Sequence, residues 1–298
     1  MKQRILLLGK NGQIGWELQR TLAPLGEVVA LGRPELDLTE FDRLREAVRE
    51  VRPEIIVNAA AYTDVDRAES EPELAMAVNG RAPGVLAEEA ARLGAVLVHF
   101  STDYVFDGAK GKPYSEQDAP NPLNVYGETK LAGERAVEAA GAAHLILRTS
   151  WVYSLRRECF VTRVLRWARE QSIIEIAADQ VSTPTWCRTI GETAAAILTL
   201  ATRDLREFGE HNSGLYHLAA SGQASRYEWA QAILSEFPGD QSRGAVQLVP
   251  SKSHEFSSPA RRPPYSALDC TRLCERFSVQ LPHWRIGLSL ASSDGAAI

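Results

Sequence analysis

Short apolar runs alternate with longer amphipathic stretches through the first half of the chain. Apolar runs rich in Val, Ile and Leu are typical of buried strands, and apolar positions that recur three or four residues apart predict helices. Regular alternation of the two predicts a parallel sheet with helices on both faces. The expected strands cover residues 4–8, 27–31, 54–58, 95–101 and 144–149, and the expected helices cover 16–25, 41–51, 73–93 (interrupted by Pro83) and 126–140.

The pattern becomes less regular after residue 151. Helical stretches remain at 160–170, 189–202 and 226–237, and polar or Pro-rich loops are expected at 180–186, 238–244 and 251–264. The last residues, 292–298, are small, and we expect them to fray. We therefore assign residues 1–151, completed by later segments near 180–200, to the sheet domain, and residues 152–298 mainly to a smaller, substrate-binding lobe.

A glycine-rich turn follows the first strand directly. A strand, a glycine turn and a helix form the setting of a dinucleotide site, where the helix N-terminus attracts a pyrophosphate. The alternative is an ordinary glycine turn. The flanking strand and helix favour cofactor binding and a Rossmann-type, doubly wound α/β fold. The candidate cofactor-binding residues in this turn are Gly9, Asn11, Gly12, Gln13, Ile14 and Gly15.

Three side chains suggest carbonyl reduction. Tyr126 and Lys130 are four residues apart in an expected helix and so share one face, and Thr102 ends an expected strand. A phenol has an ordinary pKa of about 10, and a nearby ammonium favours its ionised form. Such a phenol can exchange a proton with a substrate oxygen that also contacts the threonine hydroxyl. The alternative for Tyr126 and Lys130 is a solvated helix face.

Six sequence blocks resemble those of the dTDP-4-dehydrorhamnose reductases, a branch of the extended short-chain dehydrogenase/reductase family. The resemblance extends from Ile5 to about Leu288. It implies that Tyr126 is the proton donor, that Thr102 bonds the substrate carbonyl and that Lys130 also holds the nicotinamide ribose. The blocks are residues 9–18, 57–66, 101–108, 124–134, 148–153 and 259–263.

The second strand ends without the acid that commonly binds the ribose of NAD. It is followed by Arg33, which can bind the 2′-phosphate of NADP. We therefore expect NADPH, with NADH as the alternative cofactor; the alternative for Arg33 is a solvated surface position. Lys10 is a second candidate for the phosphate. The resemblance places Asp37 and Leu38 at the adenine, and Ala59, Ala60 and Ala61 follow a strand at the edge where cofactors bind.

The resemblance also implies a sugar site. Val65, Asp103, Tyr104 and Trp151 would line it, although a buried packing role is the alternative for Trp151. Arg261 and Arg262 suit a nucleotide diphosphate because guanidinium groups match phosphate oxygens, and a solvated loop is their alternative. His99 lies inside an apolar strand and is expected to be a core histidine. Asn79 is expected to support the catalytic strand.

The implied reaction is the reduction of the C4 keto group of dTDP-4-dehydro-L-rhamnose to give dTDP-L-rhamnose, a sugar donor for cell-surface polysaccharide. One alternative is a sister NDP-4-keto-6-deoxyhexose reductase of opposite C4 stereochemistry. Another is a non-catalytic, NADP-binding regulatory subunit, which retention of Thr102, Tyr126 and Lys130 disfavours.

Some members of the family carry Mg²⁺ at a homodimer interface, held by glutamates. Glu17 matches one of these positions, but the partner position is Arg188. A guanidinium repels a divalent ion and offers it no oxygen ligand. We therefore expect no metal, and a monomer or weak homodimer.

Composition and charge argue against several other classes of protein. The chain has 298 residues, a net charge of −5 and no basic tract, which argues against nucleic-acid binding. No apolar stretch reaches the roughly 18 residues that a membrane span needs, and the start does not resemble a signal peptide. The four cysteines show no metal-ligand spacing. We expect a cytoplasmic enzyme that binds a small nucleotide sugar, with no nucleic-acid or membrane partner.

Overall fold

The centre of the molecule is a parallel sheet. The computed structural model describes residues 3–201, 203–238 and 246–294. Apolar side chains on both faces of its strands are buried, as expected when helices cover both faces. The six strands are, in spatial order, β10 (Gly214–His217), β5 (His144–Thr149), β4 (Val96–Thr102), β3 (Ile55–Asn58), β1 (Arg4–Leu8) and β2 (Glu27–Leu31).

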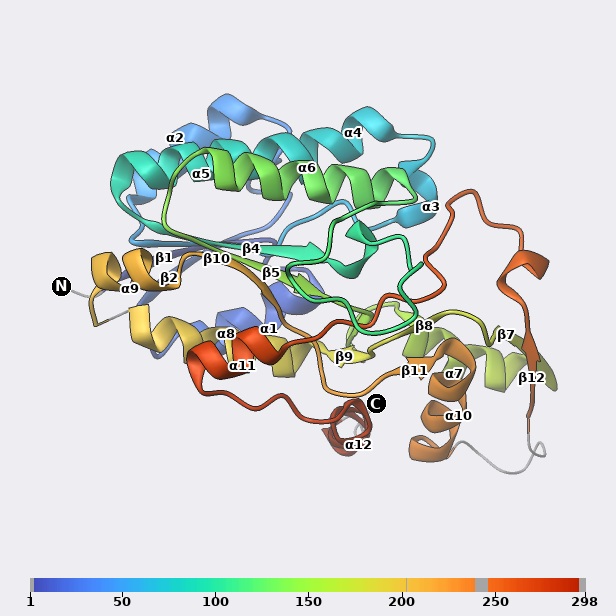
Figure 1. The fold of residues 1–298 in the computed structure, drawn as a ribbon. Coiled ribbons are helices and arrows are strands. Elements are labelled where there is room, and N and C mark those ends of the chain that lie inside the picture. Colours follow the sequence, from blue (N-terminus) through green and yellow to red (C-terminus); the bar gives the residue numbers. More distant parts are fainter. Residues whose placement is uncertain (1–2, 202, 239–245, 295–298) are drawn as a thin grey trace.

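Two layers of helices enclose the sheet (Figure 1). One layer contains α2 (Phe41–Val51), α5 (Ala82–Leu93) and α6 (Val125–Ala139). The opposite layer contains α1 (Gln13–Leu22), α8 (Cys187–Ala201), α9 (Leu205–Asn212) and α11 (Thr271–Phe277). The prediction of a doubly wound parallel sheet is therefore confirmed.

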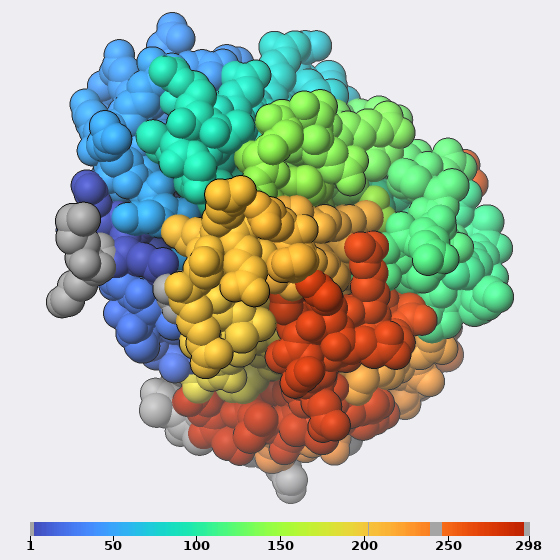
Figure 2. All heavy atoms as spheres, turned by 60° about the vertical axis from the view of Figure 1, so that its left-hand side comes forward, coloured from blue at the N-terminus to red at the C-terminus, as the bar shows by residue number. Residues whose placement is uncertain are grey.

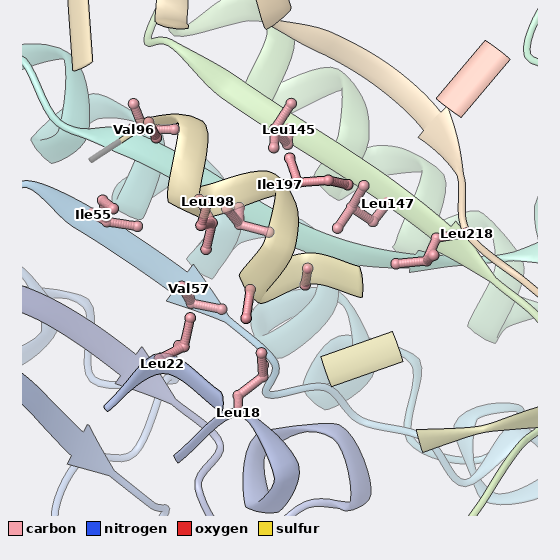
Figure 3. Close-up of a cluster of buried hydrophobic side chains, with 14 of the residues drawn as sticks. Leu18, Leu22, Ile55, Val57, Val96, Leu145, Leu147, Ile197, Leu198 and Leu218 are labelled. Atoms are coloured by element: carbon pink, nitrogen blue, oxygen red, sulfur yellow. The ribbon is translucent and has the colours of Figure 1, made fainter. Parts of the chain in front are cut away.

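The contact between α1, α8 and the sheet is a dense aliphatic cluster (Figure 3). Leu18 and Leu22 of α1 lie near Val57 of β3, and Ile197 of α8 lies beside Leu145 and Leu147 of β5, in the same cluster as Leu198. All of these side chains are at most 1% exposed. Burial of one such side chain stabilises the fold by about 1.5–3 kcal/mol. This packing fixes the start of α1, and therefore the glycine turn, relative to β1.

The helix expected at 73–93 is irregular, but at residues 77–81 and not at Pro83, where the interruption was expected. It consists of α4 (Pro72–Met76), a π-helical turn (Ala77–Arg81) and then α5, with Pro83 in the first turn of α5. A π turn inserts an extra residue and changes which side chains face inward. Here it buries Asn79, whose amide bonds both the backbone N–H and the carbonyl of Tyr62. Asn79 therefore supports the segment after β3, and not, as was expected, the strand that ends at Thr102.

A smaller lobe lies beside the carboxyl ends of the strands. It contains α7 (Phe160–Glu170), α10 (Arg226–Glu236) and the parallel pair β7 (Ile173–Ala177) and β12 (Gln247–Ser251). Its core is aromatic, with Trp151, Tyr153, Trp229 and Trp284 buried together. The helix α12 (Trp284–Asp294) closes this core from below in Figure 1.

Several boundaries differ from the predictions. The first helix begins at Gln13 and ends at Leu22, not at residues 16 and 25, because the glycine turn leads straight into it. The strand β10 and the helices α9, α11 and α12 were not predicted. Residues 180–186 contain two short strands, β8 (Val181–Ser182) and β9 (Thr185–Trp186), which pair with β11 (Ala224–Ser225) and β6 (Val152–Tyr153).

Parts of two predicted segments cannot be compared. Residues 239–244 of the predicted loop and 295–298 of the predicted frayed end lie outside the described residues.

The division of the chain at residue 151 stays a prediction. On the face shown in Figure 2 the gold-to-red second half is in direct contact with the blue-to-green first half. Within the described ranges, no helix combines the length and apolar character needed to span a membrane.

Candidate active site

The carboxyl ends of β1, β3, β4 and β5 open into a cavity of about 750 Å³. The sheet domain and the smaller lobe both contribute to its walls. It brings together most of the predicted site residues, from positions far apart in the sequence. Those that line it are Gly9, Asn11, Gly12, Gln13, Ile14, Arg33, Asp37, Leu38, Ala59, Ala60, Ala61, Val65, Thr102, Asp103, Tyr104, Tyr126, Lys130 and Trp151. Gly15, Arg261 and Arg262 do not line it.

The glycine turn is built for close backbone approach. Gly9 has φ +84°, and a Cβ on it would lie 2.6 Å from the backbone nitrogen of Ala60. Gly9 therefore allows β1 and β3 to end side by side. Gly15 does not reach the cavity because a Cβ on it would lie 2.0 Å from the Gly9 carbonyl oxygen. Its role is tight helix–turn packing, and the uncapped N-terminus of α1 is left facing the cavity.

Charged groups gather at the end of β2. Arg33 is largely exposed and its Nε lies 3.2 Å from Asp37. Asp37 also accepts a bond from the Thr39 backbone N–H, which lowers its pKa. Lys10, the second candidate for the phosphate, instead pairs with Glu35 at 2.6 Å and does not line the cavity. Arg33 is thus the cavity-lining cation at this end.

The N-terminus of α6 places Tyr126 in the cavity. Asn124 caps this helix by accepting a bond from the Gly127 backbone N–H at 2.8 Å. A Cβ on Gly127 would lie 2.3 Å from the Tyr104 carbonyl oxygen, so glycine permits this close contact. The rings of Tyr104 and Tyr126 consequently meet edge to face, with centroids 5.9 Å apart.

Thr102 is hydrogen-bonded to the Tyr126 phenol at the wall of the cavity. Its hydroxyl also lies 3.2 Å from the Asp103 carboxylate. Removal of the phenol from water raises the pKa of Tyr126, and the bond to Thr102 opposes that shift. Lys130 is not among the groups that shift this pKa. The expected lowering by Lys130 is therefore not observed here.

Lys130 is directed elsewhere in this structure. Its Nζ donates to the Phe100 carbonyl oxygen at 2.6 Å and lies 3.4 Å from Nε2 of His99. Burial lowers the pKa of Lys130 to about 8, while the charge of Glu134 acts in the opposite direction. The lysine is therefore partly neutral at slightly alkaline pH.

His99 is fully buried, as predicted, but it contacts Lys130, which was not predicted. Its Nδ1 lies 3.2 Å from the amide nitrogen of Asn58, whose amide oxygen accepts the Ala60 N–H. This chain of contacts joins the end of β3 to Lys130. The signal in the sequence was an isolated polar residue in an apolar strand, close to Thr102.

Asp103 is a hub of buried hydroxyls. Its Oδ2 accepts bonds from Ser150 at 3.2 Å, Ser182 at 3.0 Å and Ser266 at 2.5 Å. Burial raises the pKa of Asp103, and these bonds oppose that shift. The three serines belong to segments far apart in the sequence. Asp103 therefore ties the smaller lobe to the end of β4, and its predicted contact with the sugar stays a prediction.

Trp151 has a strained backbone. Its φ is +40°, an unusual value for a bulky residue and one that is common at functional sites. Its ring is buried and stacks on Trp229, with centroids 5.5 Å apart. The guanidinium of Arg226 lies 3.6 Å from its ring centroid. Both expected roles, cavity lining and core packing, apply to Trp151. The sequence did not indicate Arg226.

Arg261 and Arg262 are not among the residues that line the cavity, and their predicted contact with a nucleotide diphosphate stays a prediction. Arg262 pairs with Asp66 at 2.6 Å and is held by further contacts to Ser258 and the Ala260 carbonyl. Arg261 is exposed, and its carbonyl accepts a bond from Asn124. The Pro-flanked loop thus uses these arginines to attach itself to the sheet domain.

The position compared with the family's metal site holds an ion-pair cluster. Arg188 lies 3.6 Å from Glu17 and 2.7 Å from Asp294. No group of three potential ligands among His, Cys, Asp and Glu comes together in the described part of the chain. These residues do not fit a divalent ion, because a guanidinium stands between the two carboxylates.

A buried ion pair supports the catalytic helix. Glu134 of α6 accepts two bonds from Arg148 of β5, at 2.8 and 2.6 Å, and one from Ser101 of β4 at 2.5 Å. Both charged side chains are at most 4% exposed. The pair fixes the second half of α6 against the sheet, one turn beyond Lys130.

Comparisons with known proteins agree with this geometry. A family model described as the RmlD substrate binding domain matches residues 2–295. The dTDP-4-dehydrorhamnose reductase of Burkholderia thailandensis is 45% identical over 294 residues, with 98% of each chain covered. That of Escherichia coli K12 is 41% identical over 293 residues, with 95% of each covered.

A solved structure has the same fold. The dTDP-4-dehydrorhamnose reductase of Bacillus anthracis strain Ames, in complex with NADP, has a TM-score of 0.87 and 33% identity. The match covers 99% of this chain and 100% of that protein.

Proposed function

The chain belongs to the dTDP-4-dehydrorhamnose reductase family, and on that premise we propose that it reduces the C4 keto group of dTDP-4-dehydro-L-rhamnose. The product is dTDP-L-rhamnose. The observation that carries the proposal is the meeting of Thr102, Tyr126 and Lys130 with the glycine turn in one cavity. The family model and the relatives confirm the resemblance seen in the sequence.

The residues of the cavity fit NADPH. The crowded glycine turn and the N-terminus of α1 would hold the pyrophosphate, and Arg33 the 2′-phosphate. Asp37 and Leu38 would contact the adenine, and Ala59, Ala60 and Ala61 would line the path to the nicotinamide. When bound, the cofactor supplies the hydride, so the protein itself supplies orientation and a proton. NADH stays the alternative donor.

Tyr126 donates the proton to the developing C4 oxygen. Its phenol keeps that proton at neutral pH because burial raises its pKa, and Thr102 orients it. The Thr102 hydroxyl bonds the same oxygen as charge develops on it. Lys130 would hold the nicotinamide ribose and, when protonated, favours the phenolate left behind. Proton transfer by a positioned group typically accelerates a reaction about 10²- to 10⁴-fold.

Val65, Tyr104 and Trp151 would surround the sugar ring. Tyr104 lies edge-on to Tyr126, and Trp151 is fixed by its stacking on Trp229. The sugar is therefore confined between aromatic side chains that have little freedom to move. Such confinement selects the ring face presented to the cofactor.

We also propose a cytoplasmic location and a monomer or weak homodimer. NADPH is a cytoplasmic reductant, and all four cysteines are free, as expected in a reducing compartment. The ion pairs of Arg188 with Glu17 and Asp294 support a chain that does not dimerise through a metal ion.

Turnover with the keto sugar tests the function. Purified protein, NADPH and dTDP-4-dehydro-L-rhamnose should give loss of NADPH absorbance that depends on all three components. A matched reaction with dTDP-glucose, which has no keto group, should show none. Binding of NADPH without turnover would instead favour the regulatory-subunit alternative.

A further inference from the structure

The lobe side of the cavity is rich in arginine. Arg157, Arg163 and Arg226 line it from three different segments. None of the three forms an ion pair with a carboxylate among the residues that the structure describes. Most other cavity-facing charges have partners: Arg33 has Asp37, and Glu158 has Arg166. Uncompensated guanidinium groups in a cavity indicate an anionic ligand.

Arg226 is the most enclosed of these arginines. Its guanidinium lies 3.6 Å from the ring centroid of Trp151 and 4.8 Å from that of Phe160. Its hydrogen-bond partner is the neutral hydroxyl of Tyr104. Stacking holds the plane of the guanidinium and leaves N–H groups at its edge to donate. The side chain is thus arranged as a half-buried donor that is held in place by aromatic rings.

Like charges surround it. Arg163 and Arg262 are close enough to Arg226 to oppose its protonation, and burial acts in the same direction. Asp103 attracts it, but the Asp103 carboxylate is already bonded to three serines. Arg262 has a counter-charge in Asp66, but Arg163 and Arg226 have no paired carboxylate in the described part of the chain, so an anion between them would stabilise the cluster.

The cluster lies close to the proposed proton donor. The hydroxyl of Tyr104 contacts both Arg226 and Arg262, and the Tyr104 ring lies edge-on to Tyr126. About one aromatic ring therefore separates the cluster from the reacting centre. In a nucleotide sugar, C4 and the carbon that bears the phosphate are at opposite corners of one pyranose ring. The order of groups in the site, arginine, aromatic ring and proton donor, is thus the order that such a ligand requires.

We propose that Arg226, assisted by Arg163, binds the diphosphate of the nucleotide-sugar substrate. This assignment rests on the proposed function and replaces the assignment of that role to Arg261 and Arg262. The diphosphate of the cofactor has the same chemistry, but it belongs to the glycine turn, where Arg157 donates to the Asn11 carbonyl at 2.7 Å. Arg226 lies instead against Trp151 and Tyr104, at the substrate end.

Calorimetric titration of the full-length protein with dTDP, thymidine and NADPH tests the assignment. Arg226→Met removes the donor but keeps a long apolar stem over Trp151. It should weaken dTDP binding about 10- to 100-fold, the value of a charge-assisted contact, and leave thymidine and NADPH unchanged. Arg226→Lys should restore part of the affinity. Arg163→Met changes an exposed position and should weaken dTDP binding less. It tests the same proposal if Arg226→Met does not fold.

Arg206→Met is the matched control, because Arg206 pairs with Glu210 on the exposed helix α9, away from the cavity lining. Equal weakening of dTDP and thymidine by Arg226→Met would overturn the proposal and reduce Arg226 to packing. Weakening of NADPH alone would also overturn it. The wild-type protein could turn over the keto sugar while Arg226→Met and Arg163→Met bind dTDP as the wild type does. That result would refute this inference and leave the proposed function standing. If dTDP binding depends on these arginines but the keto sugar is not turned over, this inference stands and the proposed function is refuted.

Discussion

Loss of charge at Glu134 should destabilise the protein strongly. Glu134→Gln keeps the size of the side chain but removes the charge that faces Arg148. In the wild type that carboxylate accepts two bonds from Arg148 and one from Ser101, with no more than 4% of either charged side chain exposed. The variant leaves the Arg148 guanidinium buried without a counter-charge.

The expected loss is about 3–5 kcal/mol in the free energy of unfolding, the usual result when one partner of a buried pair is removed. A glutamine oxygen can still accept one bond, so the lower end is expected. A typical protein has only about 5–15 kcal/mol in total. The change is therefore a large part of the stability of the fold, and it acts on the helix that carries Tyr126 and Lys130.

Urea unfolding followed by circular dichroism gives this quantity. Glu138→Gln is the matched control, because Glu138 is exposed on the same helix. A second variant, Glu134→Leu combined with Arg148→Met, replaces the pair by apolar groups and should lose less stability than Glu134→Gln alone. If Glu134→Gln stays within about 0.5 kcal/mol of the control, the pair does not stabilise α6.

Four further expectations follow from the site. Tyr126→Phe should reduce turnover about 10²-fold or more with NADPH affinity unchanged; turnover within a few-fold of wild type would remove Tyr126 from the mechanism. Arg33→Ala should weaken NADPH by about 1.5–3 kcal/mol and NADH much less, as measured by fluorescence titration, and equal losses would contradict a 2′-phosphate contact. EDTA should leave activity and light-scattering mass unchanged, because Arg188 pairs with Glu17, whereas a Mg²⁺-dependent dimer would refute this. Because the pKa of Lys130 is about 8, kcat/KM should fall as pH rises through that value; a flat profile to pH of about 10 would exclude a role for its charge.

The alternation of strands and helices predicted the sheet correctly because its strands are apolar on both faces. Ile5 to Leu8 and Ile55 to Val57 are buried whichever way they point, so a short apolar run is a sufficient signal. The strand β10 escaped notice because Gly214–His217 is short, lies at the edge of the sheet and follows a polar helix. Its place beside β5 depends on a contact between residues about seventy positions apart.

The site was predictable where chemistry is local. Tyr126 and Lys130 are one helical turn apart, and the spacing of the glycines identifies the turn after β1. Both signals lie within a short stretch of the sequence. The roles of Arg226 and Arg262 could not be predicted, because they depend on partners that are distant in the sequence. Arg262 is held by Asp66, whereas Arg226 projects from the start of α10 onto Trp151, and nothing in their local sequences distinguishes the two.

The configuration of the product tests the central claim most directly. The protein is incubated with dTDP-4-dehydro-L-rhamnose and NADPH in which both hydrogens at nicotinamide C4 are deuterium, and the product is examined by NMR. We expect dTDP-L-rhamnose that carries deuterium on C4 in a single configuration. Tyr126→Phe should form the same product, at a rate reduced about 10²-fold or more. The opposite C4 configuration would identify a sister reductase, and the absence of deuterium from the sugar would contradict hydride transfer in this cavity.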